Sequence, residues 1–136
     1  MTKTKVLLIF LMATTLAMLQ GGPAAAAEIP EVKEGQALIV FYREQRLAGA
    51  AIQFHVNQNA QPIGALTNGS VMFRDVGPGQ YGFSSQVITG DSLSLTVEAG
   101  KAYFVQGTVR MGLYAGRPKF TVVDEAQARK AIAKIN

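Results

Sequence analysis

The amino-acid sequence predicts an all-β fold: an antiparallel β-sandwich or partly open barrel of about eight short strands, followed by one C-terminal amphipathic α-helix. Short apolar or alternating segments recur between residues 37 and 123, and glycine, asparagine or proline turns separate them. The hydrophobic period becomes helical only from residue 124 onward. Because strands and helices do not alternate along the chain, a parallel sheet is not expected.

Residues 1–27 have the organisation of a secretory signal peptide. A positively charged start precedes an uncharged, mostly apolar run from Val6 to Leu19, and the small side chains of Ala24 to Ala27 suit a signal peptidase. The run of 14 residues spans about 21 Å, too short for a hydrocarbon core about 30 Å thick. We therefore expect cleavage after Ala27 and a periplasmic or secreted protein with no membrane anchor.

The composition limits the remaining chain to one small domain. Removal of the signal leaves 109 of 136 residues, divided into a charged, proline-containing linker at 28–36 and a single β domain at 37–136. The chain has no cysteine, so it forms no disulfide and lacks the residue that a lipoprotein precursor acylates. Because Lys3 and Lys5 leave with the signal, the formal charge falls from +4 to +2, too low for a nucleic-acid binder.

Strands are expected where apolar residues run continuously or alternate. Residues 37–42 form a continuous apolar run, too short for a typical helix, and are expected to be a central strand buried on both faces. Alternation over 50–56 and over 93–97 indicates half-buried strands. The other expected strands are a short one around Ile63, 71–76, 81 to about 88, 101–110 and 120–123, with 111–118 as a loop.

Turn-forming residues connect these strands. Asn57–Ala60 is expected to close a tight hairpin, because asparagine tolerates left-handed backbone. Asn68-Gly69 is the strongest hairpin signal, because both central residues of a type I′ turn need positive φ. Gly77–Gly79 and Thr89–Asp91 supply two further turns.

The C-terminal helix is expected over residues 124–135. Asp124 is its N-cap, and Gln127 three residues later makes a capping box. The apolar residues Ala128, Ile132 and Ile135 recur at helical spacing, so this face is expected to dock on the sheet or on its edge. The basic residues Arg129, Lys130 and Lys134 stand late in the helix, where the helix dipole favours positive charge.

No residues with the spacing of a catalytic, cofactor or metal site stand out. His55 is the only histidine, and a Ser-His-Asp site would have to recruit Asp75, Asp91 or Asp124 from distant positions. One histidine and no cysteine are too few ligands for zinc. Residues 77–82 match the G-x-G-x-x-G spacing, but a dinucleotide site needs a helix after the turn, and here a strand is expected. We expect no cofactor and no enzymatic activity.

The long expected loop has the composition of a contact surface. Met111, Tyr114 and Arg117 lie in it, and methionine, tyrosine and arginine are enriched at protein interfaces. These three residues are the candidate binding residues. Arg43 and Arg46 form another basic spot, which is expected to be a solvated face.

A series of short motifs runs through the domain: Phe41-Tyr42-Arg43, Val56-Asn57, Ile63 to Ser70, Gly77-Pro78-Gly79 and Gly100 to Val105. Together they resemble a family of uncharacterised bacterial exported domains, many of them lipoproteins, known only as a domain of unknown function. The resemblance covers residues 37–123 and implies a β fold and an envelope location, without catalytic residues. This chain departs from the family pattern where 57–60 replace a common glycine, and in lacking the lipid-bearing cysteine.

The expected function is a non-catalytic binding or structural module of the cell envelope, whose partner is another envelope protein, a peptide or a glycan. One alternative is a small secreted hydrolase with a site around His55, which His55→Ala would inactivate. Another is an oligomeric assembly component, because an apolar strand such as 37–42 pairs readily with another chain when its edge is exposed.

Overall fold

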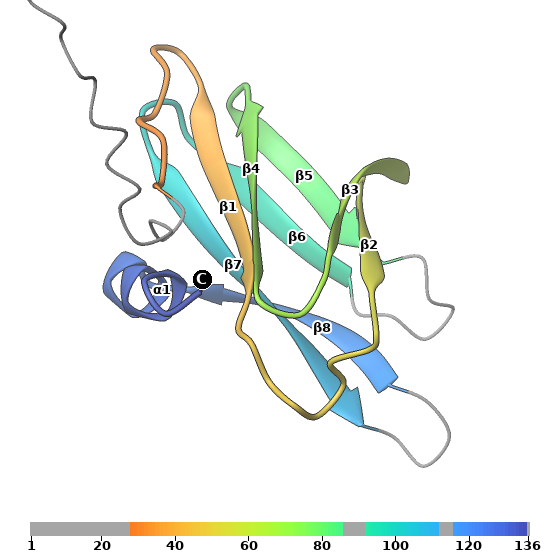
Figure 1. Cartoon of the computed structure of the whole chain (residues 1–136). Helices are drawn as coiled ribbons and strands as arrows, with labels where there is room; N and C mark the ends of the chain where they lie inside the picture. Colours follow the sequence, from red (N-terminus) through yellow and green to blue (C-terminus); the bar gives the residue numbers. More distant parts are fainter. Residues whose placement is uncertain (1–27, 86–91, 112–115, 136) are drawn as a thin grey trace, which may run out of the picture.

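The computed structural model describes residues 28–85, 92–111 and 116–135, which form a sandwich of two four-stranded sheets with one helix outside it (Figure 1). Sheet A has the strand order β4-β1-β7-β8, and sheet B has the order β3-β2-β5-β6. The elements are β1 (Ala37–Arg43), β2 (Phe54–Gln58), β3 (Gln61–Leu66), β4 (Ser70–Val76), β5 (Gly79–Ser84), β6 (Ser92–Val97), β7 (Ala102–Met111), β8 (Gly116–Val123) and α1 (Glu125–Ile132). The described strands do not close into a barrel, so the β-sandwich is the predicted architecture that is confirmed.

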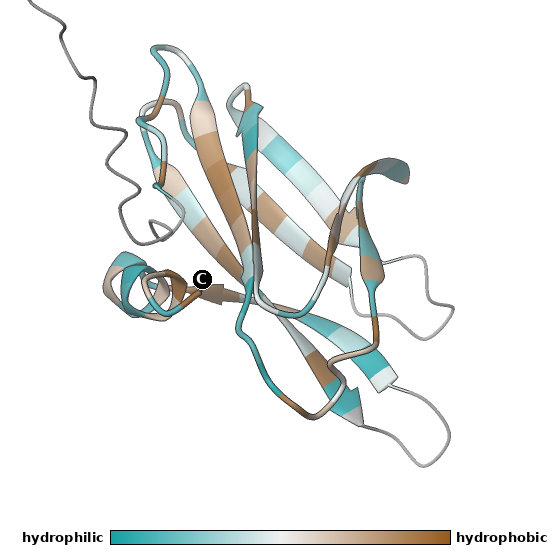
Figure 2. Cartoon of the chain, in the orientation of Figure 1, coloured by the Kyte–Doolittle hydropathy of each residue, from teal (hydrophilic) through white to brown (hydrophobic). Residues whose placement is uncertain are grey.

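Strand β1 lies in the middle of sheet A and is buried on both faces, as its continuous apolar run predicts. All of its residues are buried. Ile39 and Phe41 point between the sheets, whereas Leu38, Val40 and Tyr42 point outward beneath the helix. Figure 2 shows the resulting hydrophobic band along this strand.

The space between the sheets is filled largely by aromatic rings. Phe41 packs edge-on against Phe83 and Phe120, with ring centroids 5.1 and 6.4 Å apart, and Phe54 packs against Phe120 at 5.8 Å. Edge-to-face pairs of this kind add about 0.5–1.5 kcal/mol each to the stabilisation from burial alone. These contacts tie β1, β2, β5 and β8 together across the two sheets.

Helix α1 covers the outer face of sheet A. Asp124 Oδ1 accepts a hydrogen bond from the Gln127 backbone nitrogen at 2.8 Å, which confirms the predicted N-cap. The regular helix ends at Ile132, but the chain continues in tight turns that bring Ile135 onto the same apolar cluster. The cluster consists of Ala128, Ala131, Ile132 and Ile135 against Leu38, Val40, Tyr42 and Phe104. Ile29 and Val32, in the segment before β1, pack against it as well.

One strand pair departs from the antiparallel expectation: β1 and β7 run parallel, with Leu38 opposite Ala102 and Tyr42 opposite Gln106. All other pairs in the two sheets are antiparallel. Parallel strands need a long crossover connection. Here strands of both sheets make that crossover, so a parallel pair forms without a helix between its strands.

The Asn68-Gly69 turn is not the hairpin that the sequence predicts. It joins β3 of sheet B to β4 of sheet A, and of its two central residues only Gly69 has positive φ, at 67°. Ser70 Oγ fastens the turn by accepting from the Thr67 nitrogen at 3.0 Å and donating to the Thr67 oxygen at 2.8 Å. A type I′ turn matches the twist of two paired strands, and these two strands are not paired.

The predicted hairpin at Asn57–Ala60 is confirmed, with its turn at Asn59 and Ala60. Both of these residues have positive φ, at 48° and 67°. Their turn joins β2 to the antiparallel strand β3. The Asn59 side chain also accepts a hydrogen bond from the Gly82 nitrogen at 2.9 Å, which ties the turn to β5.

Two strand boundaries differ from expectation. β2 begins at Phe54 rather than residue 50, because residues 47–52 form consecutive turns. β8 begins at Gly116, so part of the expected loop 111–118 is strand. Pro118 is accepted because β8 is an edge strand, in which alternate N–H groups face away from the sheet.

The expected strands 71–76, 93–97 and 101–110 are confirmed within a residue or two, as β4, β6 and β7. The end of the expected strand 81–88 and the turn at Thr89–Asp91 lie outside the described residues.

Candidate binding surface

The β7–β8 hairpin extends beyond the rest of sheet A. Tyr42 opposite Gln106 is the last pair between β1 and β7, whereas β7 and β8 stay paired as far as Met111 opposite Gly116. We call residues 107–111 and 116–120 the hairpin arm; Figure 1 shows it in blue at one end of the molecule. Two strands alone are marginally stable in water, so the arm needs support from another segment.

The segment between β1 and β2 supplies that support from the inner side. Gly49 lies so close to the arm that a Cβ added there would be 3.3 Å from Cβ of Val109. A Cβ on Gly116 would collide with the Ile52 side chain and come within 2.7 Å of Val109 Cγ1. Gly49 also has φ of 74°, which disfavours other residues. The β1–β2 segment and the arm therefore form one packed end of the sandwich.

Arg43 holds the β1–β2 segment in place, and the expectation that it is solvated is wrong. Arg43 is only 3% exposed to solvent. Its Nη1 donates to the carbonyl oxygens of Ile52 and, at 3.3 Å, of Leu66, and its Nη2 donates to that of Gly49 at 2.7 Å. The guanidinium carbon lies 5.4 Å from the centroid of the Phe54 ring. Burial lowers the pKa of Arg43, but an arginine keeps its proton in proteins.

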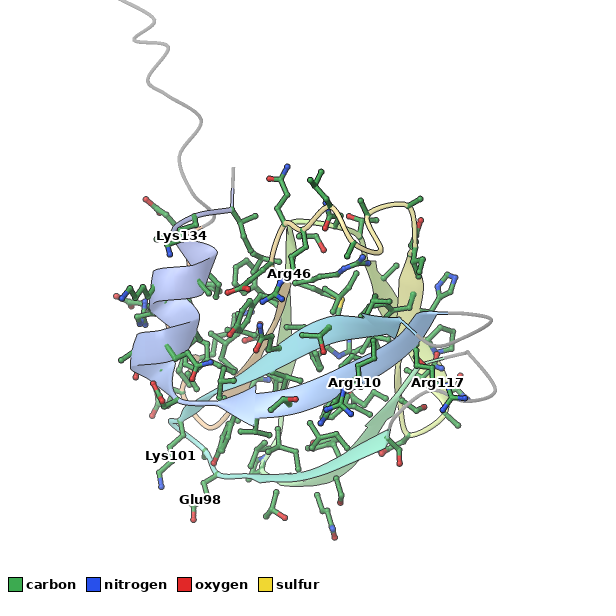
Figure 3. All side chains as sticks on the ribbon, turned by 90° about the horizontal axis from the view of Figure 1, so that it is seen from below. Arg46, Glu98, Lys101, Arg110, Arg117 and Lys134 are labelled. Atoms are coloured by element: carbon green, nitrogen blue, oxygen red, sulfur yellow. The ribbon has the colours of Figure 1, made fainter. Side chains whose placement is uncertain are left out.

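The outer face of the hairpin arm is basic. Val109 and Phe120 point inward, so the residues that alternate with them point outward, and Arg110 stands directly opposite Arg117. Lys119, two residues after Arg117, lies on the same face opposite Thr108. Both arginines are exposed and Lys119 is half-buried. Figure 3 shows the two arginines next to each other, and Figure 2 shows the hydrophilic end of the arm.

These three cations are not balanced by carboxylates within the described ranges. Four other basic residues form ion pairs, Lys33 with Asp75, Arg46 with Glu44, Lys101 with Glu98 and Arg129 with Glu125. No described carboxylate oxygen lies within 4.0 Å of Arg110, Arg117 or Lys119. Like charges directly opposite each other on a sheet destabilise it. The arm keeps an arrangement that costs stability and leaves positive charge facing solvent.

Leu47 projects from the β1–β2 segment at the same end of the molecule. It is 98% exposed, compared with 46% for Val122 and 37% for Phe73. The turn beneath it is held by a hydrogen bond from the Ala50 nitrogen to the Leu47 oxygen at 3.2 Å. Its neighbour Arg46 is exposed, as predicted, and the Arg46 backbone nitrogen donates to Asn68 Oδ1 at 2.9 Å.

Two hollows border this region, and both are too small for an organic ligand. One of about 40 Å³ is lined by Arg43, Arg46, Asn68, Gln106 and Thr108 among others, and has room for little more than one water or a small ion. The other, of about 190 Å³, lies between Glu44, Gln45 and the end of the helix. Sites for small molecules enclose about 300–1,000 Å³. The candidate site is therefore a surface.

The structure places one of the three predicted binding residues, Arg117, in this surface. The backbone of Met111 is the last part of β7, and Tyr114 lies outside the described residues. Sequence reasoning missed Arg110 and Lys119. The sequence pattern that could have found them is the spacing of Arg117 and Lys119 two residues apart. This spacing puts both side chains on one face only if the segment is a strand.

The residues considered for catalysis are not brought together. His55 is exposed on β2 opposite Ala65, whereas Asp75 is ion-paired with Lys33 at 3.0 Å and Asp124 caps the helix. Asp91 lies outside the described residues. Residues 79–82 already belong to strand β5, so the motif at 77–82 is followed by a strand, as expected, and presents no helix N-terminus to a phosphate. Within the described ranges no three His, Cys, Asp or Glu side chains gather as metal ligands do.

Comparison with known proteins identifies a family whose function is unknown. Residues 33–119 match a family described as protein of unknown function, DUF2846. An uncharacterised protein of Haemophilus influenzae is 22% identical over 112 residues, which are 82% of this chain and 66% of that protein, just under two thirds of its length. No solved structure matches the chain. In the described ranges, the helix is not of the length and apolarity that crossing a bilayer requires.

Proposed function

The chain belongs to the DUF2846 family, and we propose that it is an exported, non-catalytic binding module of the cell envelope that holds an anionic partner on its hairpin arm. The observation that carries this proposal is the cross-strand pair Arg110 and Arg117, with Lys119 beside it and no carboxylate near them in the described part of the chain. An anionic partner supplies the charge that the fold does not.

The strength of such a site follows from its exposure. Exposed ion pairs contribute about 0.2–1 kcal/mol each, so three cations acting together support a weak, salt-sensitive contact. Arginine adds geometric selectivity, because its planar fork binds carboxylates and phosphates through two parallel hydrogen bonds. Two arginines side by side suit a partner with closely spaced acidic groups.

Retention on immobilised heparin and on immobilised polyglutamate tests the arm directly. We expect the wild-type chain to be retained, and Arg110→Glu/Arg117→Glu to elute at clearly lower salt. The control is Arg74→Glu/Lys101→Glu, which has the same net charge but alters exposed sites remote from the arm. If both double variants elute together, retention follows net charge and the proposal is wrong.

Export is the second component of the proposal, and it rests on the signal-like organisation of residues 1–27. The mass of the protein recovered from the periplasm or the medium tests it. A chain that begins at Glu28 supports export with cleavage, and a chain that still begins at Met1 contradicts it.

Assembly through a strand edge is a second candidate function. Strand β4 lies at the edge of sheet A, and Phe73 on it is 37% exposed. Exposed apolar edge strands pair with other chains unless charge or proline protects them. Sedimentation at increasing protein concentration separates the two functions. A mass that rises with concentration and falls in Phe73→Lys favours assembly, and a constant monomer mass excludes it.

A further inference from the structure

We propose that the anionic partner is the headgroup surface of a lipid bilayer, with Arg110, Arg117 and Lys119 facing lipid phosphates and Leu47 entering the interfacial layer. This inference rests on the proposed function and names its partner. The structural basis is the juxtaposition of an unbalanced cationic strand pair and the most exposed large apolar side chain of the described ranges at one end of the sandwich.

The exposure of Leu47 is built into the fold. The turn that carries it is closed by the Ala50–Leu47 hydrogen bond of 3.2 Å and is held from below by Arg43, whose Nη2 donates to the Gly49 oxygen at 2.7 Å. Gly49 in turn packs against Val109 of the arm. Single exposed leucines are common on protein surfaces, so Leu47 alone means little. The packing of its turn against the cationic arm through Gly49 and Val109 sets it apart.

The two features lie together in space. The β1–β2 segment and the end of the hairpin arm project at the same end of the molecule in Figure 1. Arg46, next to Leu47, and Thr108, which shares the outer face with Arg110, line the same small hollow. Lys101 and Glu98, by contrast, stand at the opposite end of β7, where they neutralise each other (Figure 3).

A bilayer fits this end better than a soluble polyanion does. The described hollow that borders the arm, of about 40 Å³, is too small to enclose a ligand, which favours a partner that lies across the surface. A soluble polyanion offers Leu47 no apolar environment, whereas the interfacial region of a bilayer accepts apolar side chains beneath a layer of phosphates. The contribution of Leu47 therefore distinguishes a membrane from a soluble acidic partner.

The expected effects are moderate, because few groups take part. A basic residue close to an anionic leaflet increases partitioning about fivefold, so neutralising both arginines lowers it about 25-fold. Removing a leucine from a partly apolar environment lowers it about tenfold. Arg74→Gln/Lys101→Gln removes the same charge away from the arm and should change vesicle binding less than twofold.

Vesicle flotation with the protein as the producing cell processes it tests the inference. The vesicles contain equal parts of phosphatidylglycerol and phosphatidylcholine, or phosphatidylcholine alone, in about 0.1 M salt, where the screening length is about 10 Å. The proteins compared are wild type, Arg110→Gln/Arg117→Gln, Leu47→Asn and Arg74→Gln/Lys101→Gln. Circular dichroism confirms that each is folded, and mass spectrometry confirms that all share one N-terminus.

Binding to the anionic vesicles that falls about 25-fold in the arginine variant and about tenfold in Leu47→Asn supports the inference. Leu47→Asn should elute from heparin at the same salt as wild type. Equal binding to both vesicle types, or wild-type binding by Leu47→Asn, overturns the inference. Arm-dependent retention on heparin or polyglutamate without vesicle binding also overturns the inference but leaves the proposed function standing. If the wild-type chain neither is retained on these columns nor binds vesicles, the inference and the proposed function are both wrong.

Discussion

Strand β7 presents two different surfaces along one face. At its beginning Phe104 points outward and is buried beneath helix α1, where Arg129 lies 5.9 Å from its ring and is neutralised by Glu125 at 2.7 Å. At its end Arg110 points outward, opposite Arg117, and no helix covers it. The covered half is packed beneath a helix whose Arg129 is ion-paired, whereas the open half is uncovered and Arg110 and Arg117 have no described carboxylate within 4.0 Å. The end of β7 that is neither covered by the helix nor neutralised is therefore the end that is available to a partner.

The largest test of this comparison is Phe104→Ala against Arg110→Ala. Removing a fully buried aromatic ring costs about 3–5 kcal/mol of unfolding free energy, because burial is lost and a cavity remains. Removing an exposed arginine changes it by less than about 0.5 kcal/mol. Urea denaturation measures both. Equal losses in the two variants would mean that the hairpin arm is as tightly integrated as the covered half.

Arg43→Met asks how the open half is held. The substitution leaves carbonyl oxygens of Gly49, Ile52 and Leu66 without their shared donor, and each buried unsatisfied group costs about 1–3 kcal/mol. Because some of these oxygens gain water, we expect a loss of about 2–4 kcal/mol in urea denaturation. Arg46→Met, at the exposed neighbouring position, is the matched control and should lie near wild type. Similar losses in both variants would contradict the role of Arg43 in holding the β1–β2 segment.

Tyr42→Phe sharpens the description of the covered half. The Tyr42 hydroxyl is buried without a hydrogen-bond partner among the described residues, so its removal should leave stability at neutral pH unchanged or slightly raised. Burial raises the pKa of Tyr42, and the negative charges of Glu44 and Asp124 add to the effect. A tyrosine of the unfolded chain ionises near about pH 10, so the folded state loses stability as pH rises beyond that value.

The measurement is urea denaturation of both proteins at neutral pH and above about pH 10. Tyr42→Phe should lose less stability at high pH than wild type does. An identical pH dependence would show that Tyr42 ionises as easily in the folded chain as in the unfolded one.

Arg110→Glu is the smallest expected effect and has the opposite sign. The new carboxylate stands opposite Arg117, and replacing a like-charged pair by an opposite one should raise stability by a few tenths of a kcal/mol. The same substitution should weaken retention on heparin. Arg74→Glu, on the edge strand β4, tests whether any loss of positive charge does the same. A destabilised Arg110→Glu would mean that the cationic pair is structural.

Local patterns were sufficient where one segment carries its own information. The continuous run of 37–42 requires burial on both faces wherever it is placed, and strict alternation in 93–97 requires a strand with one buried face. The N-cap of Asp124 depends only on the next three residues. Each of these predictions is confirmed because no distant partner could change it.

Patterns failed where the outcome depends on what lies alongside. Asn68-Gly69 has ideal hairpin residues, but a hairpin turn forms only if the flanking strands pair, and here they belong to different sheets. Arg43 reads as a surface residue because its carbonyl partners come from three separate positions, Gly49, Ile52 and Leu66. The candidate site was found in part through Arg117. Arg110 and Lys119 were not predicted, because residues 111–118 were expected to form a loop. Only the pairing of β7 with β8 puts Arg110, Arg117 and Lys119 on one face.

The sequence by itself therefore determined an all-β chain with most of its strands in place and one capped C-terminal helix, because periodicity and turn chemistry act over a few residues. It left a sandwich and a partly open barrel as alternatives, and the structure shows the sandwich. Only the tertiary structure decided that β1 and β7 run parallel and that Arg43 is buried against carbonyl oxygens of distant residues. It also decided that three cations share an uncovered face at the end of the molecule where Leu47 lies. Those features arise from contacts between distant segments, and hydrogen-bond partners and neutralising charges are properties of neighbours in space.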